Sequence, residues 1–542
     1  MHILKRKVNP KSDFGKQLRL MRSLSPLHTI EIELKVSPEE HRKLKQVNEE
    51  LRIIRNTIMG VMYKNYKQMS RLKEYKLTMK NYINGDEKQK KEMAKKFEEL
   101  RLEYDLTFEF SRKYGEYLRK TKFSLPDSVT VLSICEMVWF SMEGLFYRGS
   151  NKVRFYKRGE FVTLQGKQAN RSIILKHGFV TFAKLNLPLK PKKDDLFIEE
   201  TLANINQYKV NGVYIDKLNV DNHLNKKPLK SSYRIRNNRI VSRCIRGKLR
   251  YFLHVVLEGN PVVKRDKDGS FRHTYGVGKV SGDIGTQSLA IKSKDKCILK
   301  NFAERAEKTF KQERKVQLIQ RKMERSRRAM NPDKFGEEGQ YIRNSKPWIF
   351  SKNYKKLKNK HQNLHRKTAA NRNYAHNEDV NDIRALGDEF IIEKMNIAGL
   401  KKRTKKTTIN NKTGKFNKKK RFGKSIQNRS PGYFIAKAKE RFIATGGSFK
   451  EVNTWTFKAS QYDHVLNDYA KKILSERWHI FPDGTKVQRD LYSAFLLYCT
   501  NDDLQTPNKK LCDLEFSNFI KLHDKCIKGI KDRRKAVLNS GL

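Results

Sequence analysis

The sequence predicts a multidomain protein of the α+β class. Its 542 residues exceed what one hydrophobic core usually organises, and 37% of them are hydrophobic, which is enough for several cores. Apolar stripes at helical spacing dominate residues 37–150, whereas short alternating runs between turn signals dominate residues 151–270. Both patterns recur in residues 271–500. We therefore expect two to four domains.

A β-domain interrupted by helices is expected in the N-terminal half. Residues 28–34 alternate between polar and apolar side chains, as a half-buried strand does. We expect residues 1–36 to supply the first strand of a β-barrel whose other strands lie in residues 151–270. The helices of residues 37–150 would then be a lobe inserted into that barrel.

A carboxylate ends the strand predicted before residue 284. Gly282 and Asp283 close this strand, and two further apolar runs follow before Glu304 opens a helical pattern. Three strands and a helix are typical of an antiparallel meander. A meander with an acid on its first strand, followed by two more acids later in the chain, is how a ribonuclease H-like nuclease core begins, so we expect one in residues 271–500.

Basic segments surround the later elements of that region. Residues 303–376 are helical and basic, and Pro332 divides them into the two arms of a hairpin. Residues 401–429 contain thirteen Lys or Arg and no Asp or Glu, so we expect a mobile arm there. Residues 501–542 are expected to be a basic C-terminal tail.

Two further acids occupy positions comparable to that of Asp283. Glu393 ends a short apolar strand, and Asp490 begins a strongly apolar helix. Each acid alone is as often a cap or a surface charge. Together, in a basic chain, the three match the needs of a two-metal phosphodiesterase, because hard carboxylate oxygens suit Mg²⁺ or Mn²⁺ and the cations relieve carboxylate repulsion.

Positive charge is the strongest compositional signal. Lys and Arg number 118 against 58 Asp and Glu, which gives a formal net charge of +60. Such self-repulsion favours a polyanionic partner, and nucleic acid is the first candidate. We expect no membrane partner because no run approaches the roughly 18 apolar residues of a spanning helix. The N-terminus lacks the apolar segment of a secretory signal, so the protein is expected to stay inside the cell.

The candidate phosphate contacts lie in the basic arm. They are Lys401, Lys402, Arg403, Lys405, Lys406, Lys418, Lys419, Lys420 and Arg421. Four aromatic residues interleaved with Lys and Arg, Tyr341, Trp348, Tyr354 and Tyr374, either stack on bases or pack between the two helical arms. His464 and His479 have no supporting pattern. The six scattered cysteines lack Cys-x-x-Cys spacing, so free thiols and no zinc are expected.

Three segments resemble motifs of a known family. They are Gly282-Asp283-Ile-Gly-Thr-Gln, Phe390-Ile-Ile-Glu393-Lys-Met-Asn-Ile and Gln488-Arg489-Asp490-Leu-Tyr-Ser-Ala-Phe. In this order they resemble the three RuvC motifs of TnpB proteins, the transposon-encoded relatives of type V CRISPR effector nucleases. The resemblance covers about residues 270–500, and the N-terminal order of elements is similar to the family's wedge barrel with an inserted helical recognition lobe.

This resemblance implies an RNA-guided DNA endonuclease that cuts beside a short flanking motif. Asp283, Glu393 and Asp490 would be its catalytic and metal-binding acids, with Mg²⁺ or Mn²⁺ as cofactor. Guide RNA and double-stranded target DNA would be its partners, with one protein chain per RNA. A mobile element would encode the protein, which would act in the cytoplasm of a prokaryotic cell in association with the nucleoid.

The chain departs from the family pattern in two places. Many members carry a four-cysteine zinc ribbon between the second and third motifs, but residues 394–490 contain no cysteine. The chain therefore resembles a variant without the ribbon and without zinc. The third motif has Tyr492 where an asparagine is usual.

Two other functions remain open. One is a nuclease-inactive, RNA-guided DNA-binding regulator, against which the intact set of three acids argues. The other is a transposase or resolvase that acts without RNA, as association with mobile elements suggests. The sequence contains no separate DNA-binding module with a recognition helix or zinc finger, which argues against the second alternative.

Overall fold

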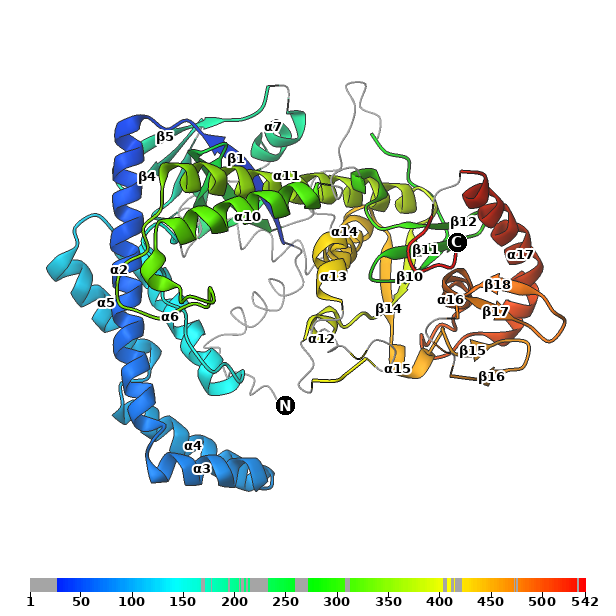
Figure 1. The fold of residues 1–542 in the computed structure, drawn as a ribbon, viewed down its shortest axis with the longest axis horizontal. Helices are drawn as coiled ribbons and strands as arrows, with labels where there is room; N and C mark the ends of the chain where they lie inside the picture. The colour runs from blue at the N-terminus through cyan, green and yellow to red at the C-terminus, as the bar shows by residue number, and fades with distance from the viewer. Residues whose placement is uncertain are drawn as a thin grey trace. The chain divides into compact units, whose positions relative to one another are not determined.

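The computed structural model contains two compact units, Met1–Val262 (unit 1) and Val263–Leu542 (unit 2), and each combines helices with strands (Figure 1). The α+β class predicted from the sequence is therefore confirmed. The structure describes residues 27–166, 171–176, 178–193, 195–203, 205, 209–210, 213–214, 233–258, 272–307, 312–402, 407–410, 414, 422–471, 473, 476–533 and 536–542.

Unit 1 is built on an antiparallel sheet of seven strands. Their order is β2 (Thr163–Gln165), β8 (Arg234–Ile245), β9 (Lys248–Glu258), β1 (Leu27–Leu34), β5 (Leu185–Lys190), β4 (Phe179–Phe182) and β3 (Ile174–Lys176). The first strand pairs with β9 and β5, which follow the helices in the chain, as we expected for residues 28–34. The outer strands β2 and β3 are not paired with each other within the described residues, so closure into a barrel stays a prediction.

Five helices lie between β1 and β2 in the chain. They are α2 (Pro38–Met69), α3 (Lys73–Asn84), α4 (Glu87–Glu103), α5 (Phe108–Lys122) and α6 (Ser128–Tyr147). Ser37 caps α2 and forms a capping box with Glu40. An apolar stripe on α2, which includes Leu51 and Ile58, packs against α6 in the core of unit 1. Two shorter elements, α7 (Leu196–Ala203) and the hairpin of β6 (Lys209–Val210) and β7 (Val213–Tyr214), follow later.

The length and apolarity of α6 correct one expectation. It is the one helix among the described residues that is long and apolar enough to cross a membrane, whereas the sequence had suggested no such segment. Half of its apolar window is buried. Val131, Val138 and Met142 belong to the core of unit 1, so α6 has the surroundings of a core helix. A core helix can be as long and as apolar as a membrane-spanning helix.

Unit 2 contains the predicted meander within a five-stranded sheet. Its order is β12 (Cys297–Asn301), β11 (Ser288–Ser293), β10 (Lys279–Ile284), β13 (Glu389–Glu393) and β14 (Ser448–Val452). The first three strands are antiparallel to one another, while β13 is parallel to both β10 and β14. Gly282 allows close packing here, because a Cβ at this position would lie 2.9 Å from Ile291 Cδ1 and 3.1 Å from the Phe390 ring.

Helices cover both faces of this sheet (Figure 1). On one face, α11 (Lys352–Arg384) and α14 (Pro431–Ala444) form a core with residues such as Val280 and Phe390. On the other face, α16 (Arg489–Tyr498) and α17 (Lys509–Asp532) form a second core with Ile391 and Val452. Successive side chains of a strand point to opposite faces, which is why neighbours such as Phe390 and Ile391 belong to different cores.

The two arms predicted for residues 303–376 are α10 (Glu313–Ala329) and α11. They follow η1 (Glu304–Ala306) and enclose a tip that contains η2 (Pro332–Lys334). The second arm is longer than predicted, because α11 ends only at Arg384.

The C-terminal tail predicted for residues 501–542 is wrong. Residues 509–532 form α17, which buries Cys512, Phe519 and Ile527 in the core beside α16. The following residues also return to the sheet, because Leu538 N donates to Asn301 Oδ1 at 2.8 Å. Lys and Arg between the apolar positions of α17 had concealed its buried face.

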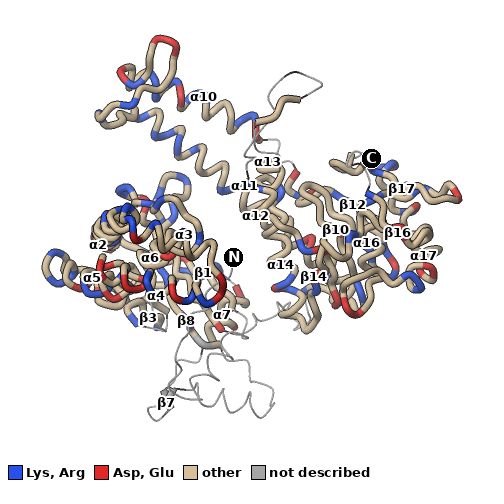
Figure 2. The backbone as a smooth tube through the Cα atoms, turned by 90° about the horizontal axis from the view of Figure 1, so that it is seen from below, with Lys and Arg blue, Asp and Glu red and all other residues tan. Residues whose placement is uncertain are grey.

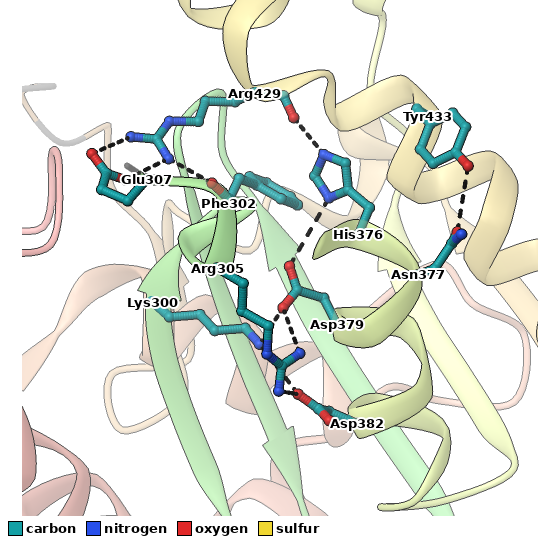
Figure 3. Close-up of polar contacts among 10 residues, drawn as sticks. All are labelled: Lys300, Phe302, Arg305, Glu307, His376, Asn377, Asp379, Asp382, Arg429 and Tyr433. Atoms are coloured by element: carbon teal, nitrogen blue, oxygen red, sulfur yellow. Dashed lines mark hydrogen bonds and ion pairs between the residues drawn. The ribbon is translucent and has the colours of Figure 1, made fainter. Parts of the chain in front are cut away.

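The basic arm predicted for residues 401–429 is partly wrong. The first residue of the predicted arm is the last residue of α12 (Ile397–Lys401). The last seven residues of the arm form α13 (Gly423–Arg429). Arg429 is only 5% exposed. Its Nη1 atom donates to Phe302 O at 2.7 Å and lies 2.9 Å from Glu307 Oε2 (Figure 3). The end of the segment is therefore anchored rather than mobile.

Buried charges beside this anchor fix α11 to the meander (Figure 3). Asp379 on α11 is buried, and its Oδ1 atom lies 2.8 Å from Lys300 Nζ of β12 and 3.7 Å from Arg305 Nη1. One turn earlier, His376 Nε2 lies 2.6 Å from Arg429 O. Charges from four separate segments compensate one another here, which local sequence patterns do not show.

Candidate active site

Two of the predicted acids lie side by side on the sheet. The parallel pairing of β10 and β13 runs as far as Gly282 opposite Ile392, so Asp283 and Glu393 are the next pair in register. Equivalent residues of parallel strands point to the same face. That face carries Ser281 and Ile391 and is covered by α16, because Ser281 Oγ donates to Ala494 O at 2.6 Å.

The third acid, Asp490, reaches the same place from α16. It occupies the first turn of this helix, where the backbone dipole favours negative charge, and its side chain is 15% exposed. Gln488 caps the helix, since its Oε1 atom accepts a hydrogen bond from Leu491 N at 2.9 Å. The backbone N–H of Gln488 donates to His523 Nε2 of α17 at 2.9 Å. These contacts hold the start of α16 in position.

The electrostatics show that Asp490 and Glu393 both lie close enough to Asp283 to affect its ionisation. Burial raises the pKa of Asp283 well above its ordinary value, and the charges of Asp490 and Glu393 raise it further. Burial also raises the pKa of both Glu393 and Asp490. The structure therefore brings the three predicted acids together as partly buried groups whose negative charges are poorly compensated.

Nearby donors and cations compensate part of this charge. Ala459 N donates to Glu393 Oε1 at 3.1 Å. Arg489 Nε lies 3.9 Å from Asp490 Oδ1 and lowers the pKa of that carboxyl, although burial outweighs this effect. The position of Arg489 is itself fixed, because its Nη1 atom donates to Glu476 O at 2.9 Å. Arg489 stands beside Asp490 in the sequence, but only the fold shows it buried at the site.

The acids fit a divalent cation by their chemistry. All three offer hard oxygen ligands. A cation would offset the cost of burying their charges, which raises the pKa of each, and the repulsion that further raises the pKa of Asp283. Among the residues that the structure describes, however, no three His, Cys, Asp or Glu side chains are already placed to hold a metal ion.

Two small hairpins occupy the stretch between the second and third acids. They pair β15 (Tyr462–Asp463) with β16 (Asp468–Tyr469), and β17 (Trp478–Ile480) with β18 (Lys486–Gln488). The short helix α15 (Thr454–Phe457) precedes them. Both hairpins contact α16, the first through His464 and the second through β17 and β18.

Side chains on these hairpins form a buried polar cluster with α16, which sequence reasoning missed. His479 Nε2 lies 3.0 Å from Asp463 Oδ2, and His464 Nδ1 lies 2.7 Å from Tyr492 Oη. The rings of His479 and Tyr492 stack with centroids 4.9 Å apart. The one sequence signal for this cluster was Tyr492, which replaces the asparagine that is usual in the third motif. Its hydroxyl contacts His464 and its ring stacks on His479.

Most of the predicted phosphate contacts lie outside the described residues. Lys401 and Lys402 are described and exposed, in agreement with their assignment to the surface. Outside the description lie Arg403, Lys405, Lys406, Lys418, Lys419, Lys420 and Arg421.

Comparisons with known proteins give little further information. No protein-family model matches the chain, and no curated protein matches it. A solved structure, described as the cryo-EM structure of a Cas12f1–sgRNA–target DNA complex, is similar at 10% sequence identity with a TM-score of 0.35. The alignment covers 88% of this chain and 99% of that one. This likeness is too weak to assign the chain to a family.

Proposed function

We propose that the protein is an RNA-guided DNA endonuclease of the TnpB kind. It hydrolyses DNA phosphodiester bonds beside a short flanking motif and uses Mg²⁺ or Mn²⁺ held by Asp283, Glu393 and Asp490. The observation that carries the proposal is the convergence of these three acids, far apart in the sequence, at one end of the sheet in unit 2. A net charge of +60 supplies the affinity for nucleic acid.

Unit 2 would be a ribonuclease H-like, RuvC-type core. The antiparallel meander β10–β12 continued by the parallel strands β13 and β14 supports this assignment. In unit 1, the antiparallel sheet whose first strand precedes five helices supports a wedge barrel with an inserted recognition lobe. Guide RNA and double-stranded DNA are the proposed partners, and a prokaryotic cytoplasm is the proposed location.

The residues of the chain would divide the work as follows. Divalent cations supply an activated water and stabilise the leaving oxygen when they are bound. Asp283 stands on a rigid central strand, and Glu393 is oriented by the backbone N–H of Ala459. Asp490 is held by the capped first turn of α16. Arg489 keeps the carboxylates from repelling one another more strongly before a cation binds.

The hairpins that stand in place of a zinc ribbon would need no metal. Hydrogen-bonded and stacked contacts among His464, His479, Asp463 and Tyr492 hold them against α16, two residues from Asp490. We propose that this cluster fixes the start of α16, and with it Asp490, where a zinc-bound ribbon would otherwise stabilise the neighbouring chain.

Sequencing of co-purified RNA followed by a cleavage assay tests this function. We expect one discrete RNA species, and the protein loaded with it should cut duplex DNA that matches the RNA when Mg²⁺ is present. Removal of RNA or of Mg²⁺ should stop cleavage. Binding of matched DNA without any cutting would favour the inactive regulator, and cutting that needs no RNA would favour the transposase or resolvase.

A further inference from the structure

We propose that the tip of the α10–α11 hairpin binds single-stranded RNA by stacking unpaired bases on a ladder of aromatic rings. The tip comprises residues 326–354 and lies within unit 2. The ladder consists of Tyr341, Trp348, Phe350 and Tyr354. The sequence had left open whether such aromatic residues stack on bases or only pack between the two arms.

The rings of the ladder are nearly parallel to one another. Tyr341 stacks on Trp348 with centroids 5.8 Å apart and planes inclined by 14°. Trp348 stacks on Phe350 at 6.5 Å and 13°, and Phe350 stacks on Tyr354 at 4.6 Å and 22°. The rings thus form an offset row of nearly parallel planes, and the flat face of a base can stack on the ring at its open end.

Cationic side chains lie over Trp348 of the ladder and over the neighbouring ring of Phe335. The guanidinium of Arg327 is 5.0 Å from the centroid of Trp348, and Lys334 Nζ is 5.2 Å from it. The guanidinium of Arg328 lies 4.6 Å from the ring of Phe335, which contacts Trp348 edge to face. Aromatic faces combined with cations are what proteins use to bind the bases and the phosphates of one strand.

The tip holds its shape through buried polar groups rather than through a hydrophobic core. The side-chain amide of Asn331 donates to Arg327 O at 2.7 Å and to Ile349 O at 2.8 Å, and it accepts from Ile349 N at 2.7 Å. Lys334 is buried and donates to Lys346 O at 2.6 Å. The ladder is therefore built on a braced loop and is ordered before any partner arrives, which lowers the entropy cost of binding.

The exposure of the ladder distinguishes a binding surface from internal packing. Tyr341, at one end, is 56% exposed, and Phe350 is 37% exposed. Single exposed rings are common on protein surfaces, but several exposed apolar side chains in one short segment, here Tyr341, Ile342, Ile349 and Phe350, indicate an interaction site. Since Tyr341 is the terminal ring, it is the one on which the first base would stack.

Charge identifies a nucleic acid rather than a protein as the partner. Residues 313–367 contain 17 Lys or Arg and 5 Asp or Glu. Figure 2 shows Lys and Arg along both arms of the hairpin, with acidic residues near its turn. An apolar protein surface would not require this excess of cations, whereas a phosphate backbone would.

The choice of RNA rests on the proposed function. In that function the DNA arrives as a duplex, whose bases are already paired and stacked, while a guide RNA offers unpaired bases from the start. Proteins recognise RNA chiefly through such unpaired bases, which they stack on aromatic side chains and on arginine. The expected occupant of the ladder is thus an unpaired segment of the guide RNA.

The experiment measures binding of a labelled oligouridylate of about ten nucleotides, roughly one binding site, to the full-length protein. A single-stranded DNA oligonucleotide and an abasic ribose–phosphate oligomer of equal length are compared. Tyr341→Ala should weaken oligouridylate binding roughly five- to hundredfold, because one stacked base is removed. Tyr341→Phe keeps the ring and should restore binding. Quenching of Trp348 fluorescence by the oligonucleotide, absent in Trp348→Phe, reports contact independently.

Tyr374 provides a matched control, since it lies on α11 outside the ladder and is 65% exposed. Tyr374→Ala should bind oligouridylate as the wild type does, and the abasic oligomer should bind wild type and Tyr341→Ala equally. Unchanged affinity of Tyr341→Ala, or equal weakening in Tyr374→Ala, would overturn the proposal. So would tight binding of the abasic oligomer or a preference for single-stranded DNA. DNA cutting plays no part in this assay, so its outcome is separable from that of the proposed function.

Discussion

The hydroxyl of Ser281 donates a 2.6 Å hydrogen bond to the carbonyl oxygen of Ala494, and it thereby joins the centre of β10 to α16. Asp283 lies two residues further along the strand, on the same face, and Asp490 lies one helical turn before Ala494. This single buried hydrogen bond therefore fixes how the strand that carries the first acid sits against the helix that carries the third.

Removal of this hydrogen bond should reduce cleavage more than stability. Ser281→Ala should lower the free energy of unfolding by about 1 kcal/mol, the usual net value of one hydrogen bond. Cleavage should fall further, because small misplacement of catalytic groups is costly. Denaturant titration and cleavage rates measure the two effects.

Ser493→Ala is the matched control, because Ser493 is buried on the same helix and its hydroxyl has no hydrogen-bond partner within the described structure. This variant should keep both stability and activity. Normal cleavage by Ser281→Ala would show that the hydrogen bond does not position the acids.

The basic arm of residues 401–429 should bind the phosphates of nucleic acid and release their counterions. Neutralising nine of its thirteen cations should weaken binding uniformly across nucleic-acid sequences and reduce the slope of log K against log salt by about 0.7–0.9 for each phosphate that the segment no longer neutralises. The residues to change are Lys401, Lys402, Arg403, Lys405, Lys406, Lys418, Lys419, Lys420 and Arg421. Affinity measured over a range of salt, for guide RNA and for target DNA, reports the slope. Parallel lines for wild type and variant would show that the segment contacts neither ligand.

His464 should make stability depend on pH. Burial lowers its pKa below the ordinary value of about 6.5, so the folded protein favours the neutral ring. As the pH falls, His464 is protonated in the unfolded chain at a higher pH than in the folded protein. The contribution of the neutral ring to the free energy of unfolding is therefore fully present above about pH 6.5 and is lost at lower pH. His464→Gln should show a flatter fall in unfolding free energy between about pH 7 and 5. Since burial also lowers the pKa of His376 and His523, some slope should remain. Identical curves for wild type and variant would contradict this assignment.

The purified protein should contain no stoichiometric zinc. Residues 394–490 lack cysteine, and in that stretch His464 and His479 contact Tyr492. Elemental analysis of extensively dialysed protein measures the metal content. About one zinc per chain would mean that the histidines are metal ligands and that the cluster is a metal site.

The acids could be predicted from the sequence because each has a local signal. Asp283 and Glu393 end apolar strands, and Asp490 starts an apolar helix, so strand and helix periodicity locate all three. The proximity of Asp283 and Glu393 follows once β10 and β13 are parallel neighbours, whereas Asp490 joins them through the packing of α16 on the sheet. Long-range pairing was not predictable in the same way. Arg429 was assigned to a mobile arm because its partner Glu307 is remote in the sequence.

Charge counting also concealed buried faces. The Lys and Arg of α17 suggested a tail, although Phe519 and Ile527 recur at helical spacing and are buried. His464 and His479 had no local support, since their partners Tyr492 and Asp463 meet them only through two hairpins and a helix. A count of charged residues therefore does not show which side chains of a segment are buried by tertiary contacts.

Cleavage by three single variants tests the central proposal most directly. Protein loaded with its RNA is mixed with matched duplex DNA and Mg²⁺, and cutting and DNA affinity are measured together for wild type, Asp283→Ala, Glu393→Ala and Asp490→Ala. Glu389→Ala is the control, since Glu389 shares β13 and the same face but pairs with Lys450. We predict that each of the three variants loses cleavage and keeps DNA affinity, because each lacks an acid of the site and none loses positive charge. Glu389→Ala should keep both. Substantial Mg²⁺-dependent cutting by any of the three would remove that acid from the site and contradict the proposal.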